Sequence, residues 1–140
     1  MVGHPMKYSF WIAVPLLIAG FLLQVGEVVL SRFEAHTEGN AVIVQWETQL
    51  EQGVVRFYLE RKTQQEVSFR AVKEMRPHGP GKLYRYKDDH VYKQGIASQV
   101  QYRLRIVYEN GASQIIPPIA VDYTSTAIRR TWGSIKAMFQ

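Results

Sequence analysis

The stretch "VQYRLRIVYENGA" at residues 100–112 decides the fold. In its first nine residues apolar and polar side chains alternate, which is the period of a half-buried β-strand. This alternation places Tyr102, Leu104 and Ile106 on one face. The Asn-Gly pair that follows tolerates the positive φ angles of a tight hairpin turn. The stretch therefore predicts a strand with one face toward a core, followed by a reversal of the chain.

The segment after the turn, "SQIIPPIAV" (113–121), is predicted to be the last strand of the domain. Pro117 and Pro118 within it have no N–H group to donate to a neighbouring strand. Such a strand belongs at the edge of a sheet, where prolines also discourage edge-to-edge association.

The same alternation recurs in the preceding sequence, with turn residues between the segments at the spacing of a β-sandwich. The predicted strands are residues 28–35, 41–48, 54–62, 66–72, 83–88, 100–108 and 113–121. In the second and third strands the side chains predicted to point inward are Val42, Val44 and Trp46, and Val55, Phe57 and Leu59. Seven strands without an interior helix predict an all-β, antiparallel sandwich of two sheets over residues 27–122.

A series of short motifs runs through this predicted sandwich. W-x-T at residues 46–48 is followed by Glu51, by F-x-L-E-R at residues 57–61 and by Y-R-L at residues 102–104. This series resembles fibronectin type III domains of the kind found in bacterial envelope and secreted proteins. The resemblance covers residues 28–122 and implies that Tyr102 is a corner tyrosine that ties the connection before its strand to that strand. The residues assigned a structural role are Trp46, Phe57, Leu59, Tyr102 and Leu104.

The first 26 residues predict a membrane anchor. The segment "FWIAVPLLIAGFLLQVG" (10–26) contains no charged residue and is close to the minimum length that spans a bilayer. Lys7 precedes it and Glu27 follows it, so the amino terminus is expected in the cytoplasm. A buried core helix is the less favoured interpretation, because Pro15 would interrupt it. The expected location is a single pass through a bacterial inner membrane, with the domain periplasmic or extracellular.

A cleaved signal peptide remains open beside the retained anchor. The small-residue A-x-A pattern that favours cleavage is absent from this segment, although Ala19 with Gly20, or Gly26, offers a poor site. A retained anchor would leave residues 1–26 in the mature protein, whereas cleavage would release a shorter protein of lower mass.

Composition and motifs argue against an enzyme. The chain has no cysteine, and its net charge of +5 is scattered rather than gathered in one block, so nucleic acid is not an expected partner. It lacks a G-x-S-x-G elbow, an H-E-x-x-H motif and a phosphate-binding loop. Asp88, Asp89 and His90 are the closest approach to a metal site and are interpreted as solvated turn residues. No cofactor and no metal are expected.

The outer face of two predicted neighbouring strands is the first candidate binding surface. It would carry Arg56 and Tyr58 on one strand and Arg103 and Arg105 on the other. Arginine and tyrosine are enriched where proteins bind one another. In the alternative interpretation, Glu60 pairs with one arginine across the strands and the remaining side chains are simply solvated.

The second candidate is a basic amphipathic helix over residues 123–140. Its apolar stripe would be Ile128, Trp132, Ile135 and Phe139, and its cations off the stripe would be Arg129, Arg130 and Lys136. Three surfaces could support it: an anionic membrane, a partner protein or the flank of its own domain.

These observations together predict a non-enzymatic, membrane-anchored envelope module. It would be attached through residues 10–26 and would hold one or more envelope proteins through its sandwich face and its C-terminal helix. The alternative is a cleaved, secreted module that binds carbohydrate or cell wall.

Overall fold

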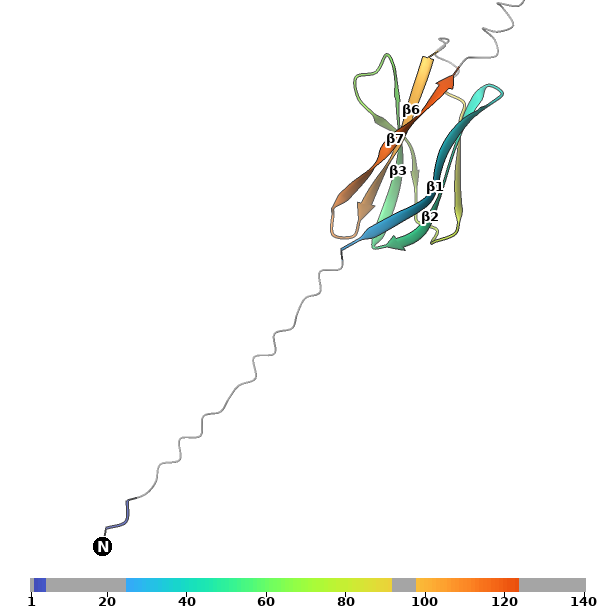
Figure 1. Ribbon diagram of the computed structural model, residues 1–140. Helices are drawn as coiled ribbons and strands as arrows, with labels where there is room; N and C mark the ends of the chain where they lie inside the picture. The colour runs from blue at the N-terminus through green and yellow to red at the C-terminus, as the bar shows by residue number, and fades with distance from the viewer. Residues whose placement is uncertain (1, 5–24, 92–97, 124–140) are drawn as a thin grey trace, which may run out of the picture.

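The computed structural model describes residues 2–4, 25–91 and 98–123. Seven strands lie within these residues (Figure 1). Their bounds are β1 Glu27–Glu38, β2 Ala41–Gln52, β3 Val54–Thr63, β4 Arg70–Met75, β5 Leu83–Asp88, β6 Ser98–Tyr108 and β7 Ser113–Tyr123. The predicted all-β architecture of seven antiparallel strands is confirmed.

The strands form two sheets, one in the order β1-β2-β5 and one in the order β4-β3-β6-β7. All pairings within both sheets are antiparallel. The chain reversal predicted after β6 is present; of the Asn-Gly pair only Gly111 has a positive φ, at 81°. The ends of this turn are closed by a hydrogen bond from the amide of Tyr108 to the carbonyl of Ala112.

β7 lies at the edge of its sheet, as the prolines predicted. Tyr102 pairs with Ile119 and Leu104 pairs with Ile116, so Pro117 and Pro118 lie at a shift in the pairing register. The two missing N–H groups therefore fall where the ladder is already interrupted.

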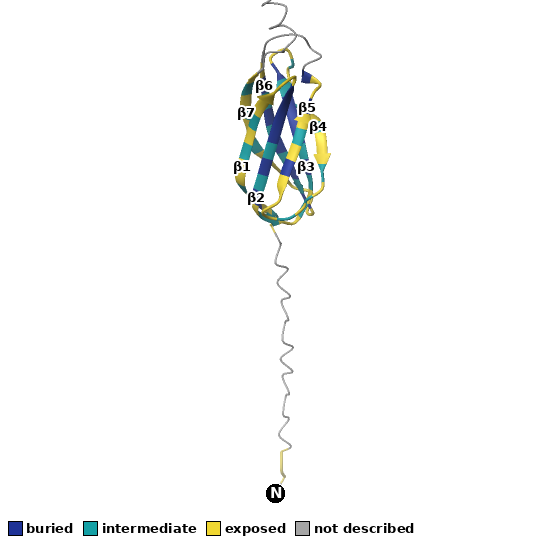
Figure 2. Cartoon of the chain, turned by 90° about the vertical axis from the view of Figure 1, so that its right-hand side faces the viewer, coloured by how far each residue is buried: buried dark blue, intermediate teal, exposed yellow. Residues whose placement is uncertain are grey.

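The core lies between the two sheets (Figure 2). At its centre the rings of Trp46 and Tyr84 stack with their centroids 5.0 Å apart, and the ring of Phe57 lies tilted against both. Aromatic pairs of this kind contribute about 0.5–1.5 kcal/mol beyond the area they bury. The predicted inward residues that are fully buried are Val42, Val44, Trp46, Phe57, Leu59, Tyr102, Leu104 and Ile106.

The predicted inward orientation of Val55 is wrong. The pairing of β3 with β6 shifts between Val54 and Arg56, so the alternation is broken by one extra residue. Val54 packs against the core in its place, and Val55 is 37% exposed.

The predicted strand at residues 66–72 is also displaced along the chain, because β4 covers Arg70–Met75. A turn holds the residues before it: the Thr63 amide donates to the Glu66 carboxylate, and the Glu66 amide donates to the Thr63 carbonyl. Val67, just beyond this turn, is 96% exposed. The predicted alternating segment does contribute to a strand, but the strand starts later, at Arg70, because Glu66 at the start of the segment belongs to the turn.

The chain begins β1 at one end of the sandwich and finishes β7 at the opposite end (Figure 1). An 11-residue strand such as β7 spans about 35 Å. Glu27 and Tyr123 are thus separated by roughly the full length of the domain.

No helix among residues 2–4, 25–91 and 98–123 is long and apolar enough to cross a membrane. The predicted span, residues 10–26, lies outside the described residues except for Val25 and Gly26. The predicted C-terminal helix lies outside them as well, apart from Tyr123.

Candidate protein-binding surface

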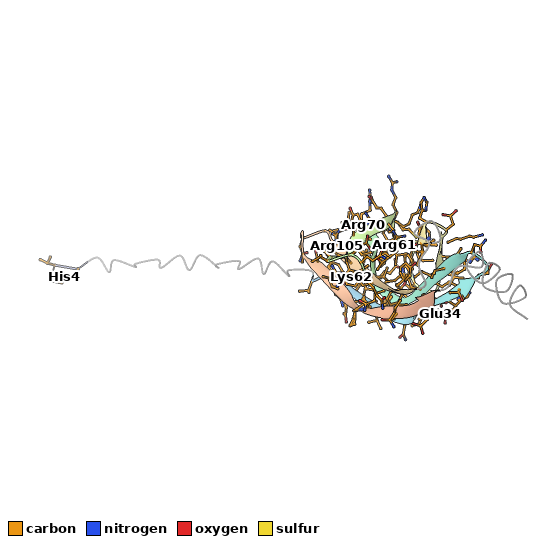
Figure 3. All side chains as sticks on the ribbon, turned by 90° about the horizontal axis from the view of Figure 1, so that it is seen from above. His4, Glu34, Arg61, Lys62, Arg70 and Arg105 are labelled. Atoms are coloured by element: carbon orange, nitrogen blue, oxygen red, sulfur yellow. The ribbon has the colours of Figure 1, made fainter. Side chains whose placement is uncertain are left out.

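The four surface residues proposed on the sandwich all lie on the outer face of the β4-β3-β6-β7 sheet, here called the outer arginine face. The pairing of β3 with β6 places Tyr58 opposite Arg105, while Arg56 lies opposite Val107. Arg103 lies opposite Glu60 in the neighbouring row. In Figure 3 Arg105 and Lys62 lie on one side of the molecule and Glu34, on the other sheet, lies on the opposite side.

Glu60 joins the two β6 arginines. Arg103 Nε donates to one oxygen of its carboxylate at 2.6 Å, and Arg105 Nε donates to the other at 2.8 Å. The Glu60 side chain is only 8% exposed beneath them. Burial by itself would raise the pKa of Glu60, but the hydrogen bonds and positive charges of Arg105 and Arg103 outweigh it and lower that pKa. The carboxylate therefore holds both arginines, and not one as the sequence-based alternative supposed.

Two aromatic rings support the same arginines. The guanidinium of Arg105 lies 4.3 Å from the ring centroid of Tyr58, and that of Arg103 lies 4.2 Å from the ring of Phe69. Such cation–π contacts contribute about 0.5–1 kcal/mol at exposed sites. Each guanidinium is thus fixed by the Glu60 carboxylate and by a ring.

Phe69 was not predicted to belong to this surface. It precedes β4 in the segment that the sequence assigned to a strand, and only the turn at Thr63–Glu66 brings its ring against Arg103. In the sequence Phe69 is marked only by its basic neighbour, Arg70, and nothing there indicates that its ring contacts Arg103.

Arg56 belongs to the same face but to a separate pair. Its Nε donates to Glu74 at 2.6 Å, and its Nη1 donates to the carbonyl of Val55 at 3.0 Å. Beside Arg105, on the other neighbouring strand, lies Ile115, which is 49% exposed. The outer arginine face therefore combines fixed cations with an exposed aliphatic side chain.

A second arginine–carboxylate cluster lies inside the domain. Arg61 Nη1 donates to both oxygens of Asp88, at 3.1 and 2.8 Å, and the hydroxyl of Tyr102 donates to Asp88 at 2.8 Å. Asp88 is fully buried, so its interpretation as a solvated turn residue is wrong. Asp89 and His90, its neighbours, are exposed and paired with each other at 2.9 Å.

This interior cluster ties the two sheets together, because Asp88 ends β5 while Arg61 and Tyr102 lie on β3 and β6. Burial would lower the pKa of Arg61, but the hydrogen bond and charge of Asp88 raise it. Burial and the negative charge of Asp88 both raise the pKa of Tyr102, so its hydroxyl stays protonated and donates. The hydroxyl of Tyr102 thus connects the end of β5 to β6.

Glu51, from the motif series, holds a loop at the other end of the sandwich. Its carboxylate accepts hydrogen bonds from the hydroxyls of Thr48 and Tyr84, both at 2.7 Å, and from the amide of Gly79 at 3.0 Å. The amide of His78 in turn donates to the hydroxyl of Tyr84 at 2.6 Å. The segment "HGPGK" at residues 78–82 is therefore a loop fixed to β2 and β5.

The start of the domain is packed closely as well. A side chain at Gly26 would overlap the ring of Tyr108, and Gly26 helps to line a hollow of about 340 Å³ with Val25, Gly53 and Tyr108. The Tyr108 hydroxyl donates to the side chain of Gln114. Gly26 is thus part of the folded domain, with no free linker between it and β1.

Within the described parts of the chain, no three His, Asp or Glu side chains lie together as metal ligands would. The proposed binding residues Ile128, Arg129, Arg130, Trp132, Ile135, Lys136 and Phe139 lie outside the described residues.

No protein-family model matches this sequence. The search of curated proteins found no significant match either.

Proposed function

We propose that this chain is a non-enzymatic envelope module with a fibronectin type III-like sandwich, anchored in the bacterial inner membrane and bound to a protein partner. The outer arginine face is the observation that carries the binding role. There, Arg103 and Arg105 are fixed by Glu60 and by two rings beside exposed Ile115. Fixed arginines and aromatics next to apolar side chains are the components of protein-binding hot spots.

The packing of Gly26 supports a membrane-proximal sandwich. If the apolar segment that begins at residue 10 crosses the bilayer, it reaches the domain at Gly26, which is held between Tyr108 and Gly53, so no flexible linker separates the span from β1. The domain would then stand with its β1 start toward the membrane and with the end of β7 away from it.

The position of Tyr123 favours a protein over the membrane as the target of the C-terminal segment. The predicted helix over residues 123–140 would be at most about 27 Å long, which is shorter than the roughly 35 Å that an 11-residue strand such as β7 spans. A helix that begins at the far end of the domain does not reach back to a bilayer at the near end. Attachment to the flank of its own domain remains the competing explanation.

The alternative function, a secreted carbohydrate- or wall-binding module, has less support from this surface. Sugar-binding platforms need exposed aromatic rings, whereas the rings of Tyr58 and Phe69 are covered by Arg105 and Arg103. Cleavage of the first 26 residues would nevertheless favour it.

Two measurements test the proposal. The mass of the mature protein and its resistance to carbonate extraction report on the anchor, and both should show residues 1–26 retained. Affinity purification from native membranes should recover a protein partner with the intact chain and lose it when residues 125–140 are deleted and Arg103 and Arg105 are replaced by glutamine. A soluble, shortened protein would contradict the anchor, and unchanged recovery would contradict the binding role.

A further inference from the structure

The two β6 arginines each keep free donor groups. Their Nε atoms bond to Glu60, but within the described residues no hydrogen-bond partner contacts the terminal Nη groups of Arg103 or Arg105. Both side chains are partly exposed, at 26% and 32%. Among the described residues, the four terminal Nη groups, two per guanidinium, thus have no hydrogen-bond partner.

These donors have a fixed spacing. Arg103 and Arg105 are two residues apart on one strand, so their backbones are about 7 Å apart along it. Glu60 and the rings of Phe69 and Tyr58 limit the rotation of both side chains. A ligand that bonds to both would pay less of the entropy that ordering a free arginine costs.

The chemistry of the surroundings favours carboxylates on a protein segment. A guanidinium donates two parallel hydrogen bonds to a planar carboxylate. Next to Arg105 the exposed Ile115 offers an apolar contact to the residues between two acidic side chains. Around them the outer arginine face carries four cations, Arg56, Lys62, Arg103 and Arg105, against the carboxylates of Glu60, Glu74 and Asp122.

Of those carboxylates, Glu60 and Glu74 are already paired with arginines of this face. Asp122 lies at the far end of β7, opposite Gln99. No carboxylate among the described residues therefore satisfies the free Nη groups.

We propose that Arg103 and Arg105 form a paired receptor for two carboxylate side chains of an acidic segment, with apolar residues between them, on the protein partner. This inference rests on the proposed function, namely that the outer arginine face binds a protein.

The test uses the full-length protein in a neutral detergent and a fluorescein-labelled peptide that alternates glutamate with leucine. A matched peptide with glutamine in place of glutamate is the control ligand. Fluorescence anisotropy should show binding of the glutamate peptide that is at least about tenfold tighter than that of the glutamine peptide, and that weakens with added salt.

Replacement of the arginines should remove this preference. Because R103Q/R105Q leaves the Glu60 carboxylate without partners, E60Q/R103Q/R105Q is measured beside it, and thermal unfolding checks that both variants fold. Both should lose about tenfold in affinity for the glutamate peptide. R103K/R105K keeps the charge but not the planar double donors, and should lose about threefold or more.

The matched control is R32Q/R85Q, which removes two arginines from the outer face of the other sheet. Its affinity should stay within about twofold of the parent. Equal losses for the two arginine pairs would show that only net charge matters and would overturn the inference. Tighter, arginine-dependent binding of anionic lipid vesicles or polyphosphate than of the peptide would overturn it as well.

Failure of the inference can be separated from failure of the proposed function. A photo-crosslinking residue at position 107, which lies opposite Arg56 on this face and outside the proposed receptor, reports whether a native protein lies there. A crosslink to the same protein in the parent and in E60Q/R103Q/R105Q would retain the proposed function while rejecting the carboxylate receptor. Absence of any crosslinked protein would reject the proposed function itself.

Discussion

Glu60 and Arg61 are adjacent on β3, yet they build two arginine–carboxylate clusters with different consequences. Glu60 points to the outer face and holds Arg103 and Arg105 at the surface. Arg61 points to the interior and is held by Asp88, where the pair is almost fully removed from water. The same chemistry therefore orders a surface on one side of the strand and ties the two sheets on the other.

The two clusters differ in whether water can stabilise a charged group that has lost its partner. In the outer cluster Arg103 and Arg105 are partly exposed, so solvent screens their charges and hydrates either guanidinium if it loses its partner. In the interior, a charge left without its partner stays desolvated, so breaking such a pair costs more than the pair contributes. We expect mutations in the interior cluster to reduce stability, and mutations in the outer cluster to reduce binding.

The largest effect should come from Asp88→Ala. This change leaves the Arg61 guanidinium buried without a counter-charge and removes the acceptor of the Tyr102 hydroxyl. The free energy of unfolding should fall by about 3–5 kcal/mol, measured by urea denaturation of the full-length protein in detergent.

The control for this change is the double variant R61M/D88L, which removes both charges. It should be less destabilised than Asp88→Ala alone, because it leaves no unpaired buried charge. If the two variants unfold at the same denaturant concentration, the unpaired charge of Arg61 is not what destabilises Asp88→Ala.

A smaller effect is expected for Tyr102→Phe. The ring remains in the core, but Asp88 loses one of its hydrogen bonds. Stability should fall by about 1–2 kcal/mol. Tyr58→Phe serves as the control, since its hydroxyl lies on the outer face, and a comparable loss there would contradict the structural role of Tyr102.

The outer cluster should show itself in the dependence of stability on pH. The pKa of Glu60 is below its ordinary value of 4.5 in the folded chain, so its contribution is present above that value and is lost as the pH falls through the folded pKa. The stability difference between the parent and Glu60→Gln should therefore shrink as the pH is lowered below about 4.5. A difference that stays constant down to acid pH would show that the arginines do not stabilise the ionised carboxylate.

The smallest effect is expected for Arg56→Gln. Its pair with Glu74 is at the surface, where the Glu74 side chain is 53% exposed, and exposed ion pairs contribute about 0–1 kcal/mol. The midpoint of thermal unfolding should change by no more than a few degrees. A change in this midpoint as large as that of Asp88→Ala would contradict the expectation that the ion pairs on the outer side of β3 contribute less to stability than the buried pair on its inner side.

The sequence was sufficient for features that depend on local periodicity and turn chemistry. Alternation placed Trp46, Leu59 and Leu104 inward, because successive side chains of a strand point to opposite faces. The Asn-Gly pair located the last hairpin, and the prolines located the edge strand. Each of these signals is carried by a few neighbouring residues.

Tertiary structure decided what depends on pairing between distant strands. The shift of register between β3 and β6 reversed the roles of Val54 and Val55, although both are valines. Phe69 joined the outer arginine face only because a turn brings it beside Arg103.

Asp88 shows the limit of the sequence most clearly. Next to Asp89 and His90 it has the composition of a solvated turn, and nothing near it in the chain indicates Arg61 or Tyr102. Apart from the displaced strand β4 and the position of Val55, the sequence determined the strands, their inward faces and the chemistry of each side chain, because these are local properties. Only the packing of β5 against β3 and β6 decided that one aspartate is a buried tie between sheets, because burial is set by residues far away in the chain.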